Sequence, residues 1–147
     1  MHTSSSHPRQ RGFSLLEVLI VVAIIGVVAA LAVPNFVNSR QAAHNASAFS
    51  SLRLIHSAQI AYRARFDQYG DLTELRDAGT LTDPLLVSGT RSNYNFVVNP
   101  ATLGSDYYEV SATPSVAPWR YYYIDASGVI RSSMGSAANA SSPPISY

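Results

Sequence analysis

The chain has 147 residues, which gives room for one globular domain. It contains no cysteine, and this excludes disulfides, thiolate metal sites and a cysteine nucleophile. Ten basic and nine acidic residues give a formal net charge of +1, a balance that provides no electrostatic footprint for nucleic acid. We therefore expect no specific nucleic-acid binding.

The N-terminal third divides into a short polar leader and a long apolar run. Residues 1–12 include Arg9 and Arg11 but no acid, and between residues 13 and 33 only Ser14 and Glu17 are polar. As a helix, this run would span about 30 Å, the thickness of a bilayer core. A carboxylate inside such a segment costs about 3 kcal/mol on insertion scales and by default indicates a function. Glu17 is therefore the first candidate functional residue.

The helical pattern continues beyond the apolar run, from residue 35 to residue 69, with no glycine or proline. In this part only one face is apolar, because the apolar residues recur at spacings of three and four. We expect this amphipathic half to pack against the rest of the chain. The expected stripe, interrupted only by Gln59, consists of Leu52, Ile55, Gln59, Tyr62, Phe66 and Tyr69.

From residue 70 onward the pattern changes to that of strands and turns. Residues 71–79 predict a short helical turn, residues 82–92 a loop, and residues 125–128 a hairpin loop. The last segment, 133–147, is rich in Ser, Ala, Gly and Pro and is expected to be a flexible tail. Alternating apolar residues predict strands at 94–99, 107–113, 120–125 and 128–132. The expected fold is α+β, with a long N-terminal helix packed on an antiparallel sheet of three or four strands within 70–132.

Two general interpretations of the apolar run come first. A secretory signal peptide would have a cleavage site at Ala30-Leu31-Ala32, but its apolar region would contain Glu17 and the helical pattern would continue past the cut. A plain membrane anchor holding an extracytoplasmic binding module explains the length and the basic leader, which would stay cytoplasmic. Neither interpretation explains Glu17.

A third interpretation comes from resemblance. The segment RGFSLLEVLIVVAIIGVVAALAVPNF, residues 11–36, resembles the N-terminus of type IV pilins and type II secretion pseudopilins. In that family a basic leader ends in glycine, cleavage precedes a Phe or Met, and a glutamate is fifth from the cut. Gly12, Phe13 and Glu17 occupy these places, and Gly26 and Pro34 match the usual helix-weakening positions. The match is specific over residues 9–36 and only architectural beyond them.

The resemblance implies a non-enzymatic structural subunit of a type IV pilus or a closely related filament. It implies cleavage between Gly12 and Phe13 by a prepilin peptidase and N-methylation of Phe13. The segment 13–34 would lie in the bacterial inner membrane, N-terminus cytoplasmic, and then in the core of a cell-surface or periplasm-spanning helical filament of identical subunits. There, Glu17 would meet the N-terminal amine of a neighbour and set its register. Assembly would need an inner-membrane platform and a separate motor ATPase.

The residues leave several alternatives open. Ser14 stands where the family more often has threonine, a mild departure. The absence of cysteine weakens assignment to disulfide-bearing pilins, so a type II secretion pseudopilin remains an alternative, as does a minor or priming pilin. The sequence does not choose between adhesion, twitching motility and DNA uptake.

Two other groups of polar residues could be interpreted as catalytic or metal-binding, but we do not adopt this interpretation. His44 and His56 are twelve residues apart, which places them about 120° apart around a helix with no acidic partner at ligand spacing. The acidic residues of 71–83 match no EF-hand and are expected to be solvated, although calcium binding is the alternative. We expect no cofactor. These acidic residues are Asp71, Glu74, Asp77 and Asp83.

Overall fold

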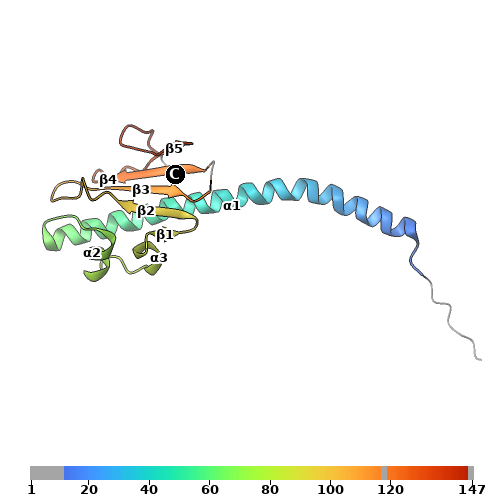
Figure 1. Ribbon diagram of the computed structural model, residues 1–147, viewed down its shortest axis with the longest axis horizontal. Coiled ribbons are helices and arrows are strands. Elements are labelled where there is room, and N and C mark those ends of the chain that lie inside the picture. Colours follow the sequence, from blue (N-terminus) through green and yellow to red (C-terminus); the bar gives the residue numbers. More distant parts are fainter. Residues whose placement is uncertain (1–11, 117–118, 146–147) are drawn as a thin grey trace, which may run out of the picture. The chain divides into compact units, whose positions relative to one another are not determined.

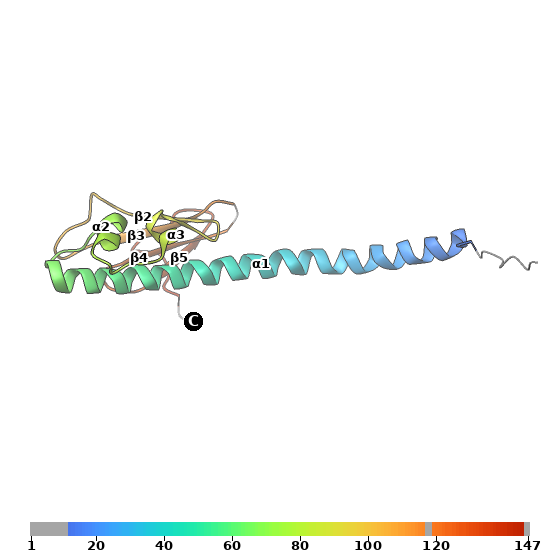
Figure 2. The ribbon, with the colours of Figure 1, turned by 90° about the horizontal axis from the view of Figure 1, so that it is seen from below.

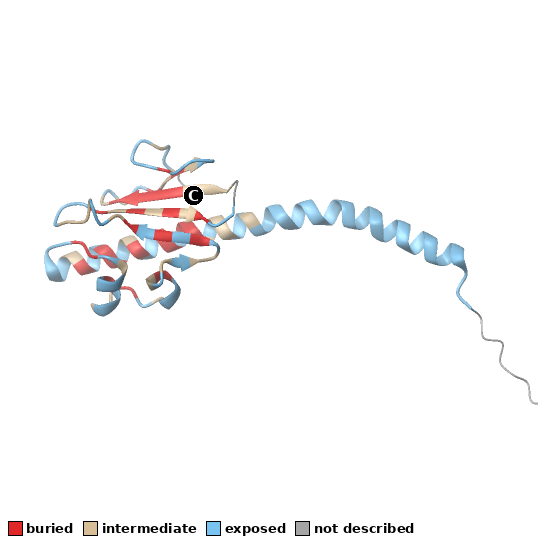
Figure 3. Cartoon of the chain, viewed as in Figure 1, coloured by how far each residue is buried: buried red, intermediate tan, exposed pale blue. Residues whose placement is uncertain are grey.

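The computed structural model describes residues 12–116 and 119–145. Within them the chain forms two compact units, one ending at Ser39 and one beginning at Arg40. The first unit contains the N-terminal half of helix α1 (Leu15–Phe66), whose 52 residues continue into the second unit. Every described residue from 12 to 39 is exposed, as the pale blue helix in Figure 3 shows. The apolar run therefore finds no core of its own.

The second unit packs the C-terminal half of α1 on one antiparallel sheet (Figures 1 and 2). Two short helices, α2 (Leu72–Asp77) and α3 (Pro84–Val87), connect α1 to the sheet. The strands follow one another in the spatial order β1-β2-β3-β4-β5. Their bounds are β1 (Thr90–Arg91), β2 (Tyr94–Val98), β3 (Glu109–Pro114), β4 (Arg120–Asp125) and β5 (Arg131–Met134).

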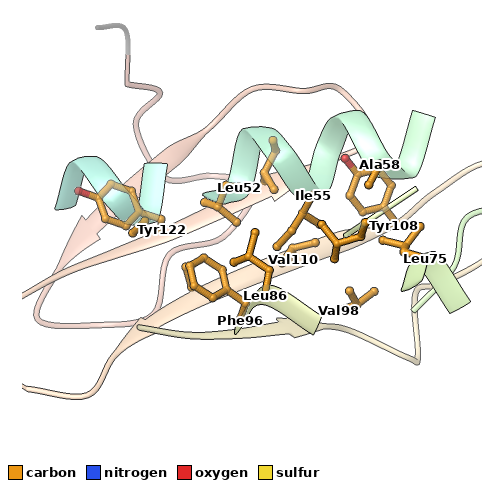
Figure 4. Close-up of a cluster of buried hydrophobic side chains, with 14 of the residues drawn as sticks. Leu52, Ile55, Ala58, Leu75, Leu86, Phe96, Val98, Tyr108, Val110 and Tyr122 are labelled. Atoms are coloured by element: carbon orange, nitrogen blue, oxygen red, sulfur yellow. The ribbon is translucent and has the colours of Figure 1, made fainter. Parts of the chain in front are cut away.

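The core lies between α1 and the sheet because each element has one apolar side. Along β2 buried and exposed residues alternate strictly, and β3 shows the same period of two. Leu52 and Ile55 of α1 are fully buried and face the inward side chains of the strands, among them Phe96 and Val110 (Figure 4). The prediction of an α+β fold with a long N-terminal helix on an antiparallel sheet is confirmed.

The sheet has five strands rather than the expected three or four, because residues 82–92 are not a plain loop. Asp83 caps α3 by accepting hydrogen bonds from the backbone of Leu85 and Leu86. The same carboxylate pairs with Arg91 of β1 at 3.0 Å. A strand of two residues carries no periodicity that sequence analysis could have recognised.

Helix α1 ends at Phe66, three residues earlier than expected. Asp67 adopts a left-handed conformation with φ of 56°, which stops the helix. Phe66 is consequently 47% exposed, and its expected place in the buried stripe is wrong. Tyr69 is buried, but it reaches the core from the following loop, where its N–H donates to the carbonyl of Gly104.

The tail 133–147 also differs from the expected flexible segment. Its described residues turn back along β5, so that Ser132 N–H donates to the Pro143 carbonyl and Ile145 N–H donates to the Ile130 carbonyl. A β-bridge between Arg131 and Pro144 lies between these two bonds. The tail thus covers the outer edge of the sheet, a common way to block strand addition.

Candidate functional site

The candidate site begins where α1 begins. Gly12 and Phe13 precede the helix and belong to no helix or strand, and a methyl group placed on Gly12 would meet no atom within 4 Å. Phe13 is 82% exposed. The peptide bond between these residues is therefore open to approach from outside, as a peptidase substrate must be. Residues 1–11 of the expected leader lie outside the described residues.

Glu17 lies in the first turn of α1, and its side chain is exposed. The Ser14 carbonyl accepts hydrogen bonds from the backbone N–H groups of Glu17 (3.1 Å) and Val18 (3.3 Å), which closes that turn. Unpaired N–H groups give a helix N-terminus a partial positive charge, so a carboxylate is favoured at this place. In the sequence, Glu17 is also the only ionisable side chain between Phe13 and Ser39.

The surface around Glu17 is almost entirely apolar. Helix α1 is long and apolar enough to cross a membrane by length and composition, and its most apolar window is wholly exposed. Leucine, isoleucine and valine point to all sides of the helix there, so no single face could be covered by a domain of ordinary size. Large apolar residues exposed by about half or more include Leu15, Leu16, Leu19, Ile24, Ile25, Val27, Leu31 and Phe36.

Gly26 and Pro34 both lie inside this helix without interrupting it. Proline has no N–H to donate to the carbonyl four residues earlier, and two polar side chains that follow it make additional hydrogen bonds to backbone carbonyls. The Asn35 amide donates to the Leu31 carbonyl at 3.1 Å, and the Ser39 hydroxyl donates to the Asn35 carbonyl at 2.9 Å. That Gly26 and Pro34 weaken the helix during assembly stays a prediction.

A second group of polar residues joins α1 to the loop that follows it and to the strand region, and sequence analysis missed its role. Gln59, which interrupts the apolar stripe, is fully buried and makes two hydrogen bonds to the backbone of Gly70. His56 makes a hydrogen bond through Nδ1 to the Tyr108 hydroxyl of the strand region. Burial lowers the pKa of His56, and the nearby Asp125 carboxylate opposes this effect. Both residues thus have a structural role.

The outer face of the sheet carries a hydrogen-bond network. The Tyr123 hydroxyl donates to Glu109 at 2.9 Å and lies 2.9 Å from the Tyr107 hydroxyl, while Asn99 donates to the other oxygen of Glu109. Burial, followed by these hydrogen bonds, raises the pKa of Tyr123 above its usual range. The hydrogen bonds of this network hold β3, β4 and the 99–107 loop together. Both carboxylate oxygens of Glu109 accept a hydrogen bond.

The acidic residues of 71–83 have structural partners. Asp71 caps α2, and it forms a capping box with Glu74, whose carboxylate accepts from the Asp71 N–H at 2.8 Å. Asp77 pairs with the neighbouring Arg76. Within residues 12–116 and 119–145, no group of three or more His, Cys, Asp or Glu side chains could hold a metal ion. Helix capping and ion pairs with arginine therefore account for the partners of these acids.

Comparison with known proteins places this architecture in a family. A sequence pattern described as the prokaryotic N-terminal methylation motif matches residues 7–33. The chain is 33% identical over 107 residues to the type II secretion system core protein G of Escherichia coli, covering 70% of this chain and 73% of that protein. It is 41% identical over 71 residues to the type IV major pilin protein PilA of Myxococcus xanthus, covering 48% of this chain.

A further relative is the type II secretion system core protein G of Pectobacterium carotovorum, 39% identical over 61 residues. The chain spans only 32% of the Myxococcus pilin and 39% of the Pectobacterium protein, in contrast to most of the Escherichia coli protein.

The long N-terminal helix, exposed along its apolar half and packed on a sheet along the other half, is the architecture of a chain whose apolar segment has no cover within its own globular unit. The chain belongs to the type IV pilin and type II secretion pseudopilin superfamily. Because its relatives are structural subunits, the prediction that the chain is not an enzyme is confirmed.

Proposed function

We propose that the chain is a structural subunit of a type IV pilus or a closely related filament, assembled through the N-terminal half of α1. One observation carries this proposal. The apolar segment is exposed on all sides, contains one carboxylate, and lies in a different unit from a globular part that has its own core. Such a segment needs a partner that surrounds it.

Two environments would satisfy the apolar segment in turn. Before assembly the bilayer surrounds it, because hydrocarbon tolerates an apolar helix whose backbone hydrogen bonds are all internal. After assembly the same segments of other copies would surround it in the core of a helical filament. The prepilin peptidase, the inner-membrane platform and the separate motor ATPase that this cycle needs remain part of the proposal.

Cleavage between Gly12 and Phe13 would make Glu17 useful. The new amine at Phe13, N-methylated or not, is a cation at neutral pH. A buried carboxylate is costly without a partner and tolerated with one, so pairing Glu17 with the Phe13 amine of a neighbour would fix the register between subunits. The unprocessed chain would offer no such cation at this place.

A secretion pseudopilin is the second candidate function. The alignment that includes most of the globular unit is with a type II secretion core protein, whereas the pilin alignment covers about half of this chain. Deleting the gene separates the two candidates. Loss of surface pili with normal protein export indicates a pilus, and loss of export with normal pili indicates secretion.

Cleavage is tested by the intact mass and N-terminal peptide of the mature protein. We expect a chain that begins at Phe13 and carries one extra methyl group. A mature chain that begins at Val33 would establish the signal-peptide interpretation instead. Gly12→Val should leave the precursor uncut, because a branched side chain at the cut obstructs close approach to the backbone.

The docking role of Glu17 is tested in cells. Glu17→Gln retains the size of the side chain and loses its charge, so it should be processed and accumulate in the membrane yet give few or no filaments. Ser14→Ala, three residues away in the same turn, is the matched control and should leave filament numbers unchanged. Normal filament numbers in Glu17→Gln cells would refute the docking role.

A further inference from the structure

The globular unit has two chemically different ends. We call the proximal end the one where α1 enters, comprising residues 40–48, 91–94, 114–116, 119–120 and Met134. The distal end is the one where α1 ends. It includes the first residue of β3, Glu109, and the last residue of β4, Asp125, which pair with each other. The registers place these two groups at opposite ends of the same sheet.

Aromatic and apolar side chains mark the proximal end. Trp119, the single tryptophan of the chain, stacks on His44 with ring centroids 5.0 Å apart and planes inclined by 24°. Trp119 is only half-buried. Val116 and Met134 lie at the same end and are 50% and 58% exposed. An aromatic ring with a polar edge, flanked by exposed apolar side chains, suits the boundary between water and lipid.

Charge is distributed unevenly between the two ends. From residue 35 to residue 66, α1 has four arginines and two histidines but no acid. At the proximal end, exposed Arg40 and half-buried Arg120 are joined by Arg91, which pairs with the acid nearest to this end, Asp83. The distal end is acidic on balance, in spite of Arg63, Arg65, Arg76 and Arg131. Its acids are Asp67, Asp71, Glu74, Asp77, Asp106, Glu109 and Asp125.

The chain itself limits how far the proximal end can be from the apolar segment. His44 lies only seven positions after Val37, the last of the exposed apolar residues of the first unit. Seven residues span about 10 Å as a helix and at most about 25 Å when extended. With the apolar segment across a bilayer, the proximal end cannot leave the neighbourhood of the lipid headgroups.

We propose that the proximal end is a lipid-contact surface, which docks on anionic phospholipid headgroups with Trp119 at the interface while the subunit waits in the membrane. This inference rests on the membrane stage of the proposed function. Positive charge near the membrane and negative charge far from it favour this orientation of the globular unit. The contact is lost when the subunit moves into a filament, where lipid is absent.

The single tryptophan allows a direct test with the full-length chain. The protein is reconstituted in vesicles of phosphatidylethanolamine and phosphatidylglycerol that contain a trace of phosphatidylcholine brominated either near the headgroup or near the chain end. We expect Trp119 emission to shift to shorter wavelength than in detergent. Lipid brominated near the headgroup should quench this emission more strongly than lipid brominated near the chain end.

Arginine variants test whether electrostatic attraction to anionic headgroups contributes to docking of the proximal end. Near an anionic surface each arginine contributes enough attraction to change the ratio of docked to undocked protein about fivefold. Arg40→Gln should therefore reduce shallow quenching, as should phosphatidylcholine vesicles or 1 M salt. Arg65, an exposed arginine of the same helix at the distal end, provides the matched control: Arg65→Gln should leave shallow quenching unchanged. Circular dichroism checks that each variant is folded.

The outcomes separate this inference from the proposed function. Vesicle flotation reports whether the apolar segment anchors the chain in the bilayer. If the protein does not float with the vesicles, the membrane stage of the proposed function is refuted. Flotation with unquenched, water-exposed Trp119 would overturn the inference alone. Shielding of Trp119 in detergent that increases with protein concentration would also overturn it, because the proximal end would then contact a second copy of the chain.

Discussion

Gln59 is the residue whose replacement tests the packing argument most sharply. Its side chain is fully buried, with Nε2 donating to the Gly70 carbonyl at 2.6 Å and Oε1 accepting from the Gly70 N–H at 3.0 Å. Gly70 lies in the loop after α1 and is itself buried. The amide of one side chain thus satisfies both polar backbone groups of one residue, as the facing residue of a neighbouring strand would do.

Gln59→Leu keeps the approximate size and removes both partners. An unsatisfied buried donor or acceptor costs about 1–3 kcal/mol, and leucine recovers part of this through apolar burial. We expect a net loss of about 2–4 kcal/mol in the free energy of unfolding. Ile60→Ala, at the next position of α1, is the control: Ile60 is 48% exposed, so its truncation should cost less than about 1 kcal/mol.

Urea denaturation of a fragment that contains residues 38–147 measures both values. Amide hydrogen exchange adds a local measurement, because the Gly70 N–H should be protected in the wild type and exchange rapidly in Gln59→Leu. Equal or higher stability of Gln59→Leu would refute the argument. It would mean that loop rearrangement or water satisfies Gly70 at no cost.

Three further predictions concern the same fragment. It should unfold cooperatively as a folded monomer, because its core lies wholly within the second unit, and a non-cooperative melt would contradict this. Ile55→Ala should cost about 2–5 kcal/mol, whereas Phe66→Ala should cost much less, because Ile55 is fully buried and Phe66 is 47% exposed; equal losses by denaturation would disprove the assignment of the buried stripe. Because burial lowers the pKa of His56 in the folded state, the unfolded chain binds a proton first as pH falls below about 6.5, so stability should decrease from that pH downward. His56→Gln should flatten this part of the stability–pH curve, and an unchanged slope would exclude His56 as its cause.

Sequence patterns predicted the elements whose apolar period is long enough to recognise. The stripe at Leu52, Ile55 and Tyr62 located the buried face of α1, and β4 has the predicted bounds of 120–125. Phe66 was misplaced because spacing alone does not reveal that Asp67 leaves the helix with a positive φ. The family resemblance, rather than periodicity, pointed to Gly12 and Phe13.

The parts that sequence analysis missed depend on contacts between distant residues. Asp83 followed by Pro84 is a local helix-start signal for α3, but the pairing of Asp83 with Arg91, which holds β1, is not visible in a local pattern. The tail has the composition of a flexible segment, but the Arg131 guanidinium donates to the Ser142 carbonyl at 3.0 Å and helps to hold it on β5. Gln59 interrupts the apolar stripe in the sequence, and helical periodicity does not reveal its partner because Gly70 lies beyond the end of α1.

The change of pattern within α1 explains why one helix can serve two partners. Up to Val37 the apolar side chains point to all sides, which suits lipid or a bundle of identical helices. From Ala48 onward only one face is buried, and the sheet of the same chain covers it. Between them, residues 38–47 are mostly polar or small and bury no large apolar side chain. In the proposed function, a subunit built in this way would exchange lipid for neighbouring subunits along its first half without disturbing the core that holds its second half.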